Sequence, residues 1–259
     1  MLRALLASLP VLLALGLGLG CDSGPPAPAS IRMAHLAPDV PTANFCLKQD
    51  GTPTFGAPLL PSGGLAFASV AAARASVDAG MYSVRVVPGG ATDCNASLSN
   101  LGDIPGISLG EGGAYTLGLV GELSGSSNIV GIATYVDDLA APAAPQLKLR
   151  YVHASPELPT VDVGTLSGTL FTPLVPNLSY PGIATGQYLT YNSPYSGATL
   201  ALLQSGTTSV LLQGSPFAVN GGTVNSLFIV GRPTQGSGDQ RLSFLLCTDT
   251  GPASCTRFP

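Results

Sequence analysis

Two histidines, His35 and His153, are the side chains of this sequence best suited to proton transfer or metal binding. Both fall at the same place in a repeated segment, because residues 31–41 (IRMAHLAPDVP) recur as residues 149–159 (LRYVHASPELP). One histidine with one nearby carboxylate offers too few ligands for a zinc site. The pattern therefore favours a buried, neutral imidazole that is hydrogen-bonded, and we expect no metal ion and no cofactor.

The same repeat supplies charged groups around each histidine. Arginines precede the histidines (Arg32 and Arg150), and carboxylates follow them just past a proline turn (Asp39 and Glu157). Side chains alternate along a strand, so the arginines point away from the face that carries the histidines. A buried imidazole needs a partner, and we expect the carboxylate either to supply it or to bond the backbone of its own turn.

A G-x-S-x-G pattern at Ser108 is followed by Asp137 or Asp138 and then by His153, which is the hydrolase order. That serine must sit between a strand and a helix, whereas residues 110–113 (GEGG) would break any helix. We interpret this segment as a loop that feeds the next strand. The two aspartates adjoin and point to opposite sides of an extended chain, which suits the end of a strand. A hydrolase would need Ser108 and His153 in contact, and we do not expect an enzyme.

Four of the eight tyrosines gather in one stretch, as Tyr180, Tyr188, Tyr191 and Tyr195. Tyr188 aligns with Tyr82 of the first half, which favours a place in the core or a tyrosine corner. Tyr191 falls on the opposite face, and Tyr195 falls in a predicted loop. Aromatic rings with hydroxyl tips make rigid contacts to sugars or proteins, so Tyr191 and Tyr195 are the candidate ligand contacts. A buried satellite cluster is the alternative.

The chain has five cysteines, and its N-terminus is typical of a targeting segment. Arg3 and the apolar residues 4–20 precede Cys21, and the run GLGC resembles a bacterial lipoprotein signal in which that cysteine is lipidated. Gly18 stands where such signals usually have leucine. The alternatives are an ordinary secretory signal that is cut nearby and an uncleaved anchor helix. The proline-rich residues 22–30 that follow favour a cleaved lipoprotein signal and a flexible tether.

The other four cysteines indicate an oxidising compartment outside the cytosol. Four cysteines allow three pairings, and the economical one joins Cys46 to Cys94 and Cys247 to Cys255, within each half. No Cys-x-x-Cys motif occurs, so zinc or redox chemistry has little support.

The composition is that of a folded, loop-rich chain. Hydrophobic residues make up 45% and charged residues 9%, with 33 glycines and 23 prolines. A chain this apolar can bury a core despite its glycine and proline content. The formal net charge of −4 leaves no basic face for phosphates, so nucleic acid is not an expected partner.

Short runs rich in valine, isoleucine, leucine, threonine and tyrosine alternate with turn residues, which predicts an all-β fold. The predicted strands are residues 31–36, 43–47, 81–87, 114–120, 129–136, 149–154, 160–163, 187–192, 224–230 and 242–247. Residues 69–78 are the one weak helix candidate. The predicted domains are a signal peptide (1–20), a tether (21–30), a first β-sandwich (31–139), a linker (140–146) and a second β-sandwich (147–259).

The repeated segment resembles the opening signature of a bacterial family of secreted or surface-attached domains of unknown function, DUF4397, written R-x-x-H-A-S-P-D-x-P-x-V-D-V. The second copy keeps every fixed position except that Glu157 replaces aspartate. The first copy keeps Arg32, His35, Pro38, Asp39 and Pro41 but departs at residues 36–37 and 44–45. The resemblance implies tandem immunoglobulin-like or transthyretin-like β-sandwiches outside the cytoplasm, with no catalytic residues to carry over.

These observations predict a non-catalytic lipoprotein of the bacterial cell envelope, anchored by its N-terminal lipid on the periplasmic or cell-surface side. We expect a binding, adhesion or scaffolding module that acts through contacts with an envelope protein. The alternative is recognition of an envelope or extracellular polysaccharide. A polysaccharide reader should expose Tyr191 and Tyr195 on one platform, whereas a scaffold should expose an apolar patch or a strand edge.

Overall fold

The computed structural model describes residues 24–60, 63–124, 129–193, 195–233 and 240–259, without the side chains of residues 184–186 and 195–198. The predicted signal and Cys21 lie outside the described residues. β-Strands dominate the described part of the chain, as predicted, and its one helical turn is the 3-10 turn η1 (Leu98–Asn100). No helix in this part is long and apolar enough to span a membrane.

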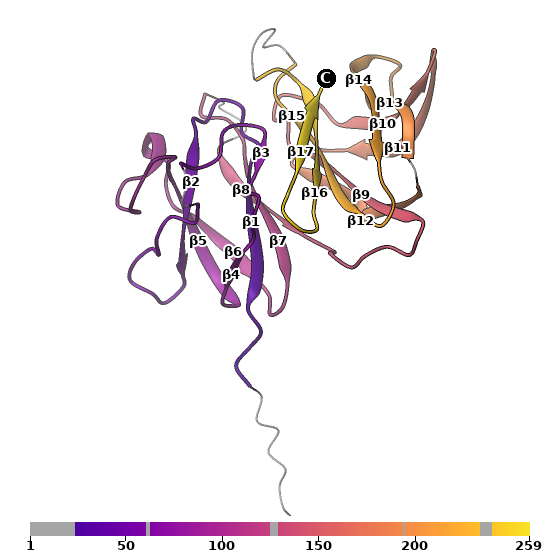
Figure 1. Cartoon of the computed structure of the whole chain (residues 1–259). Helices are drawn as coiled ribbons and strands as arrows, with labels where there is room; N and C mark the ends of the chain where they lie inside the picture. The colour runs from indigo at the N-terminus through magenta and orange to yellow at the C-terminus, as the bar shows by residue number, and fades with distance from the viewer. Residues whose placement is uncertain (1–23, 61–62, 125–128, 194, 234–239) are drawn as a thin grey trace, which may run out of the picture.

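Two sheets form the first half of the molecule, drawn in indigo to magenta in Figure 1. In sheet 1, β1 pairs with β3 and β4 on one side and runs parallel to β7 on the other, and β7 pairs with β8. Sheet 2 has the order β2-β5-β6. The strands are β1 (Ala29–His35), β2 (Ala43–Gln49), β3 (Ser69–Val70), β4 (Ala75–Val77), β5 (Gly80–Pro88), β6 (Ile104–Leu109), β7 (Ala114–Val120) and β8 (Gly131–Val136).

Two further sheets form the second half, drawn in rose through orange to yellow. Sheet 3 has the order β12-β9-β15-β16-β17, again with a parallel pair at its centre, β9 and β15. Sheet 4 has the order β11-β10-β13-β14. The strands are β9 (Gln146–His153), β10 (Val161–Ser167), β11 (Leu170–Leu178), β12 (Gly182–Asn192), β13 (Tyr195–Gln204), β14 (Val210–Val219), β15 (Val224–Val230), β16 (Ser243–Thr248) and β17 (Cys255–Phe258).

Alternating apolar residues give each half its own core. In the first half, Ile31 and Met33 of β1 face Phe45 of β2 and Val84 of β5 in one cluster of buried side chains. In the second half, the cluster contains side chains from β9, β10, β13 and β15. Burial of these rows between two sheets is the main stabilising contribution of a β-sandwich.

Two disulfides are present, and each lies within one half. Cys46 of β2 is joined to Cys94, and Cys247 of β16 is joined to Cys255 of β17. This is the economical pairing expected from the sequence. The longer loop that is closed, 48 residues between Cys46 and Cys94, restricts the unfolded chain more than the separation of 8 residues in the C-terminal hairpin.

Several local predictions were wrong. Residues 69–78 form β3 and β4 rather than a helix, because β1 needs hydrogen-bonding partners along its outer edge. Ser108 lies in a strand, β6, rather than in a loop, and Tyr195 begins β13. Tyr188 lies on β12 beside β9, whereas Tyr82 lies on β5 beside β2, so these two tyrosines are not equivalent.

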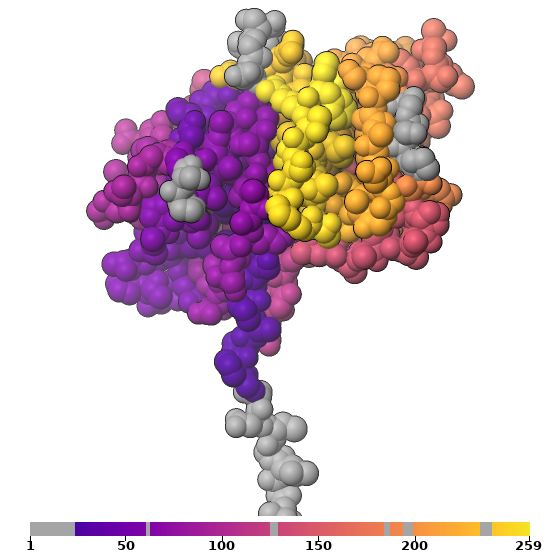
Figure 2. All heavy atoms as spheres, viewed as in Figure 1, coloured from indigo at the N-terminus to yellow at the C-terminus, as the bar shows by residue number. Residues whose placement is uncertain are grey.

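The two halves pack closely against each other through sheets 1 and 3. A third apolar cluster combines both halves, with Ala34, Leu36, Val70, Val120 and Tyr135 from the first and Val152, Ala154, Phe228, Val230, Leu245 and Cys247 from the second. Figure 2 shows the yellow C-terminal strands lying directly against the purple surface of the first half. β1 and β9 are therefore covered on both faces.

Candidate functional site

The signature arginines lie in this interface between the halves and not on the molecular surface. Arg32 on β1 is 2% exposed, and Arg150 on β9 is fully buried. Both point away from the sandwich core, as the strand alternation predicts, since Ile31 and Met33 point into it. A charge that is buried to this extent must be paired and hydrogen-bonded.

Arg32 contacts both halves of the molecule. Its Nε donates a hydrogen bond to Oγ1 of Thr116 on the neighbouring β7, at 2.8 Å. Its Nη1 donates to the carbonyl oxygen of Thr248 at 3.0 Å, and its Nη2 pairs with the carboxylate of Asp249. Thr248 and Asp249 belong to the second half, so Arg32 connects β1 to the end of β16.

Arg150 makes the reciprocal set of contacts. Its Nε donates to Oγ of Ser226 on β15 at 3.1 Å, its Nη1 to the carbonyl oxygen of Val136 at 3.0 Å, and its Nη2 to Oδ1 of Asp137 at 2.8 Å. Each arginine thus crosses to a carboxylate and to the carbonyl of the preceding residue in the opposite half. Such mutual contacts are those of an isologous, two-fold interface.

A hydroxyl group connects each arginine to the carboxylate of its own half. Thr116 Oγ1 donates to Asp137 Oδ2 at 2.8 Å, and Ser226 Oγ donates to Asp249 Oδ2 at 2.7 Å. The registers are the same, because Arg32 lies opposite Thr116 in the β1–β7 pair and Arg150 lies opposite Ser226 in the β9–β15 pair.

Each carboxylate has a further partner that differs between the halves. Arg74, from the break between β3 and β4, donates to Asp137 Oδ2 at 2.6 Å. The hydroxyl of Tyr188 donates to Asp249 Oδ2 at 2.7 Å, and the Arg150 guanidinium lies 4.8 Å from the centre of the Tyr188 ring. Tyr188 therefore contacts the charged groups of the interface and does not form a tyrosine corner.

The electrostatics of the cluster keep the Asp137 carboxylate charged and the Tyr188 hydroxyl neutral. Burial raises the pKa of Asp137, but the positive charges of Arg150 and Arg32 outweigh this effect and the pKa is lowered. Burial and the negative charge of Asp249 raise the pKa of the Tyr188 hydroxyl, so it remains a donor. Asp138, by contrast, faces solvent and pairs with Lys148 at 2.5 Å, so the two adjacent aspartates do point to opposite sides.

A second charged cluster surrounds Arg232 at the edge of the same interface. Its Nε lies 2.5 Å from Oε1 of Glu122 and 3.3 Å from Oε1 of Glu157, and its Nη2 lies 3.0 Å from Oδ2 of Asp39. Glu122 and Arg232 follow equivalent strands, after LGLVG and LFIVG respectively. Equivalent positions of the two halves thus carry opposite charges, and the two side chains form an ion pair across the interface.

The signature histidines are fully buried, and each bonds the backbone just past its proline turn. The Nε2 atom of His35 lies 3.1 Å from the carbonyl oxygen of Pro41, and that of His153 lies 3.1 Å from the carbonyl oxygen of Pro159. A carbonyl only accepts, so Nε2 carries the proton, while Nδ1 of His153 accepts from the Ser155 amide at 3.3 Å. Burial lowers both imidazole pKa values, that of His153 to about 4.

The signature histidines are hydrogen-bonded to backbone groups, whereas the signature carboxylates contact other partners. Asp39 accepts hydrogen bonds from the backbone amides of Leu123 and Ser124, each at 2.9 Å, so it bonds the loop after β7 and not its own turn. Both alternatives expected for Asp39 were therefore wrong. The proline carbonyl is a nearer partner for the imidazole, because the turn after β1 brings it back beside the strand.

The candidate ligand contacts are placed as follows. Tyr191 is half-buried, packs against the core of the second half, and shares a hydrogen bond with the hydroxyl of Tyr151 at 3.1 Å. The side chain of Tyr195 lies outside the described residues, so the proposed pair stays a prediction. Ser108 is exposed on β6 in sheet 2, whereas His153 is buried on β9 in sheet 3, and the structure does not bring them together.

The charged groups of the interface cluster are paired with one another and hold the two halves together. Three guanidinium groups and two carboxylates meet with hydroxyls and carbonyls that satisfy them, and the described residues contain no group of histidine, cysteine and carboxylate side chains that could hold a metal ion. The sequence did signal this interface. Ala34 and Val152 are apolar although they share the faces of Arg32 and Arg150, which is typical of strands covered on both faces.

Comparison with known proteins gives a family but no function. The family described as "Domain of unknown function (DUF4397)" matches residues 29–164. No curated protein matches the chain. Among solved structures, the Bacillus anthracis TIE protein is similar with 12% sequence identity and a TM-score of 0.24, and the match covers 90% of this chain and 44% of that one. The chain therefore spans less than half the length of the TIE protein.

Proposed function

The chain belongs to the DUF4397 family of domains of unknown function, and from that premise we propose that it is a non-catalytic lipoprotein of the bacterial cell envelope. In this proposal it carries two tandem copies of the family domain and acts as a binding or scaffolding module through protein contacts. The observation that carries the proposal is the use of the signature residues. Arg32 and Arg150 pair with carboxylates across the interface and so join the halves, and the described residues around them include no group that could hold a metal ion.

The tandem arrangement is supported by equivalent parts in the two halves. Each half has a parallel strand pair in the same register, an arginine that crosses the interface, and a histidine bonded to a proline carbonyl. The placement outside the cytoplasm is supported by the two disulfides and by the apolar N-terminal segment that ends at Cys21.

Contacts with proteins are favoured over contacts with polysaccharide. Tyr191 packs against the core, so its ring offers less surface to a sugar than an exposed platform would. The edges of sheet 4 instead expose large apolar side chains, with Leu170 on β11 69% exposed and Val210 on β14 47% exposed. Exposed apolar groups on edge strands are the features by which sheets recruit other chains.

The experiment is a pull-down from solubilised envelope with residues 22–259, which contain every residue that the structure describes. We expect retained material to be lost after protease treatment and to survive glycosidase treatment. The double variant Leu170→Lys, Val210→Lys should lose the partner, whereas Ala96→Lys, an exposed position of the first half, should keep it. Retention that disappears only after glycosidase treatment would replace the protein-contact proposal with polysaccharide binding.

A further inference from the structure

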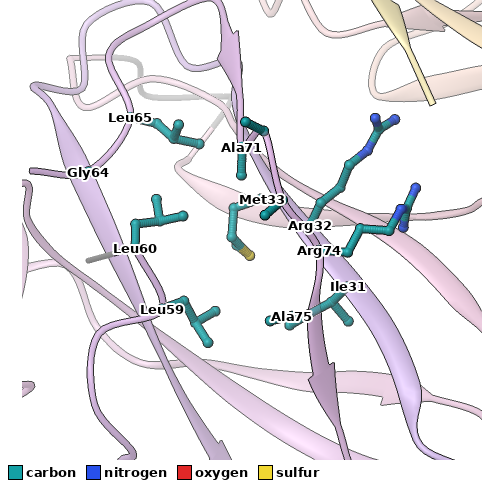
Figure 3. A pocket seen from close by; sticks show the side chains of 12 residues that line it. Ile31, Arg32, Met33, Leu59, Leu60, Gly64, Leu65, Ala71, Arg74 and Ala75 are labelled. Carbon is teal, nitrogen blue, oxygen red and sulfur yellow. The ribbon is translucent and has the colours of Figure 1, made fainter. Parts of the chain in front are cut away.

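A cavity of about 290 Å³ opens at one edge of the first half, between β1 and the segment that follows β2. Figure 3 shows aliphatic side chains around it, from sheet 1 and from the segment that connects β2 to β3. They include Ile31, Met33, Leu59, Leu60, Leu65 and Ala75. A cavity of this volume, at the lower end of the range of ligand pockets, is about twice the size of one that takes up benzene.

The second half fills the equivalent space with its own side chains. Ala75 lies opposite Ile31 in the β1–β4 pair, and Leu189 lies opposite Leu149, the counterpart of Ile31, in the β9–β12 pair. Leu189 packs against the core of the second half, whereas the smaller Ala75 leaves room beside the core of the first. Met33, likewise, stands where the second half has the fully buried Tyr151.

The wall of the cavity formed by the segment after β2 also fills less space than its counterpart in the second half. In the second half, β11 forms an additional edge strand of sheet 4, and its Val175 and Leu178 are buried in the core. In the first half, the described residues between β2 and β3 form no such strand, and Leu59 and Leu60 pack only partly against the core. Among the described residues, the first half therefore lacks the strand that covers this edge in the second half.

The lining selects an uncharged aliphatic ligand. None of the described residues that line the cavity is aromatic, so this lining offers no ring on which a sugar or a base could stack. Arg32 and Arg74 border it, but their guanidinium groups point away from the leucines in Figure 3 and are paired with Asp249 and Asp137. An anionic group would have to displace one of these buried ion pairs.

We propose that this cavity binds one short, uncharged aliphatic chain of about the size of 1-octanol, which takes the place that Leu189 and Tyr151 fill in the second half. In the second half, Leu189 packs against the core here while residues 188–192 of β12 keep continuous pairing with β9. The inference does not depend on the proposed envelope function.

The test is isothermal titration calorimetry of 1-octanol and of octanoate into residues 22–259. We expect saturable binding of 1-octanol with one site, and octanoate should bind no more tightly because both arginines are already paired. Ala75→Leu, which copies Leu189, should weaken the binding of 1-octanol at least tenfold. Ala218→Leu, the same change at an exposed position of β14, should leave binding unchanged.

The absence of saturable octanol binding would overturn the proposal, as would equal binding by the unchanged chain and Ala75→Leu. Octanoate that binds tenfold more tightly than octanol would overturn the assignment of an uncharged ligand, because it would show that an arginine is available. Should Ala75→Leu fail to fold, Ala71→Val narrows the cavity from the strand break that follows β3 and replaces it in the comparison.

Discussion

At the scale of single residues, the signature histidines hold a fixed protonation state. Each imidazole is neutral, with the Nε2 proton donated to a proline carbonyl that lies six residues further along the chain. A protonated His153 would direct a second N–H toward the amide of Ser155, which already donates to Nδ1. The pair therefore anchors the turns after β1 and β9, and it is suited to shape these turns and not to transfer protons.

This arrangement makes stability depend on pH. The imidazole pKa is about 6.5 in the unfolded chain and about 4 for His153 in the folded chain, so the unfolded state binds more protons in that window. The contribution of the neutral His153 to the free energy of unfolding is fully present above about pH 6.5. It falls as the pH drops toward 4, by about 3 kcal/mol. Urea unfolding at pH 7, 5.5 and 4.5 measures the loss.

The matched variant is His35→Gln together with His153→Gln, since a glutamine amide can still donate to the proline carbonyls but does not titrate. Its stability at pH 7 should be lower than that of the unchanged chain, and its slope between pH 7 and 4.5 should be nearly flat. An unaltered slope would show that other groups cause the dependence. Asp137 is not among them, because its lowered pKa confines its loss of stability to pH values below this window.

At the scale of elements, two glycines determine where the charged ends of the interface lie. Gly121 and Gly231 end β7 and β15 with φ angles of 97° and 91°, and Glu122 and Arg232 follow them. An added Cβ would lie 2.5 Å from the carbonyl oxygen of Ile129 at Gly121 and 2.3 Å from that of Arg241 at Gly231. These positions thus require glycine both for the backbone angle and for the close approach.

Gly121→Ala or Gly231→Ala should each lower the free energy of unfolding by about 3 kcal/mol, because both a left-handed backbone and a steric overlap must be accommodated. Gly222→Ala is the matched control, since its φ is 78° but a Cβ there meets nothing within 4 Å. It should cost about 1 kcal/mol, the backbone contribution alone. Equal losses in thermal or urea unfolding for Gly222→Ala and Gly231→Ala would contradict the role of the close contact.

The two central parallel strand pairs could be predicted from the sequence, whereas the edge strands of sheet 4 could not. β7 and β15 have the predicted bounds because glycines flank each strand on both sides and mark where it begins and ends. β11 and β14 were missed because prolines interrupt them, at Pro173 and Pro216 for example, and prolines are tolerated on edge strands. The tyrosine alignment failed because a short glycine–tyrosine pattern recurs in turns of unrelated strands, whereas hydrogen-bond register identifies true equivalents.

At the scale of the whole molecule, the face of a strand could be predicted, but not what covers it. The alternation placed Arg32 and Arg150 opposite the histidines, yet their partners, Asp249 and Asp137, lie in the other half. The relative placement of two β-sandwiches depends on surfaces that are assembled only after each has folded. The repeated arginine is nevertheless informative, since a charge on a face that is otherwise apolar must find a buried partner.

The buried arginines should therefore matter far more than exposed ones. Arg150→Met leaves Asp137 with one fewer buried partner, and we expect it to cost about 4 kcal/mol of unfolding free energy. Arg85→Met removes the partner of Asp103, a pair whose side chains are 24% and 35% exposed, and should cost at most about 1 kcal/mol. Chemical denaturation of the two variants compares them directly. Similar losses would mean that the interface is not closed in solution.

The ion pair between Glu122 and Arg232 is asymmetric, because equivalent positions of the two halves carry opposite charges. Variants of this pair can therefore show whether the charges make the two halves complementary to each other. Two identical halves would bring like charges together at these equivalent positions, whereas this chain brings opposite charges together, at 2.5 Å. Arg232→Glu would gather four carboxylates, with Asp39 and Glu157 adding to the repulsion, and should cost about 3 kcal/mol of unfolding free energy.

Adding Glu122→Arg to Arg232→Glu restores an opposite pair with its direction reversed. Asp39 and Glu157 come from equivalent turns of the two halves, so the new arginine meets a carboxylate environment similar to that of the old one. The double variant should recover at least half of the loss caused by Arg232→Glu, which a double-mutant cycle of unfolding free energies measures. Additive losses would show that the charges act separately. Recovery would show that this pair orients one half against the other, an asymmetry that two copies of a single unit could not supply.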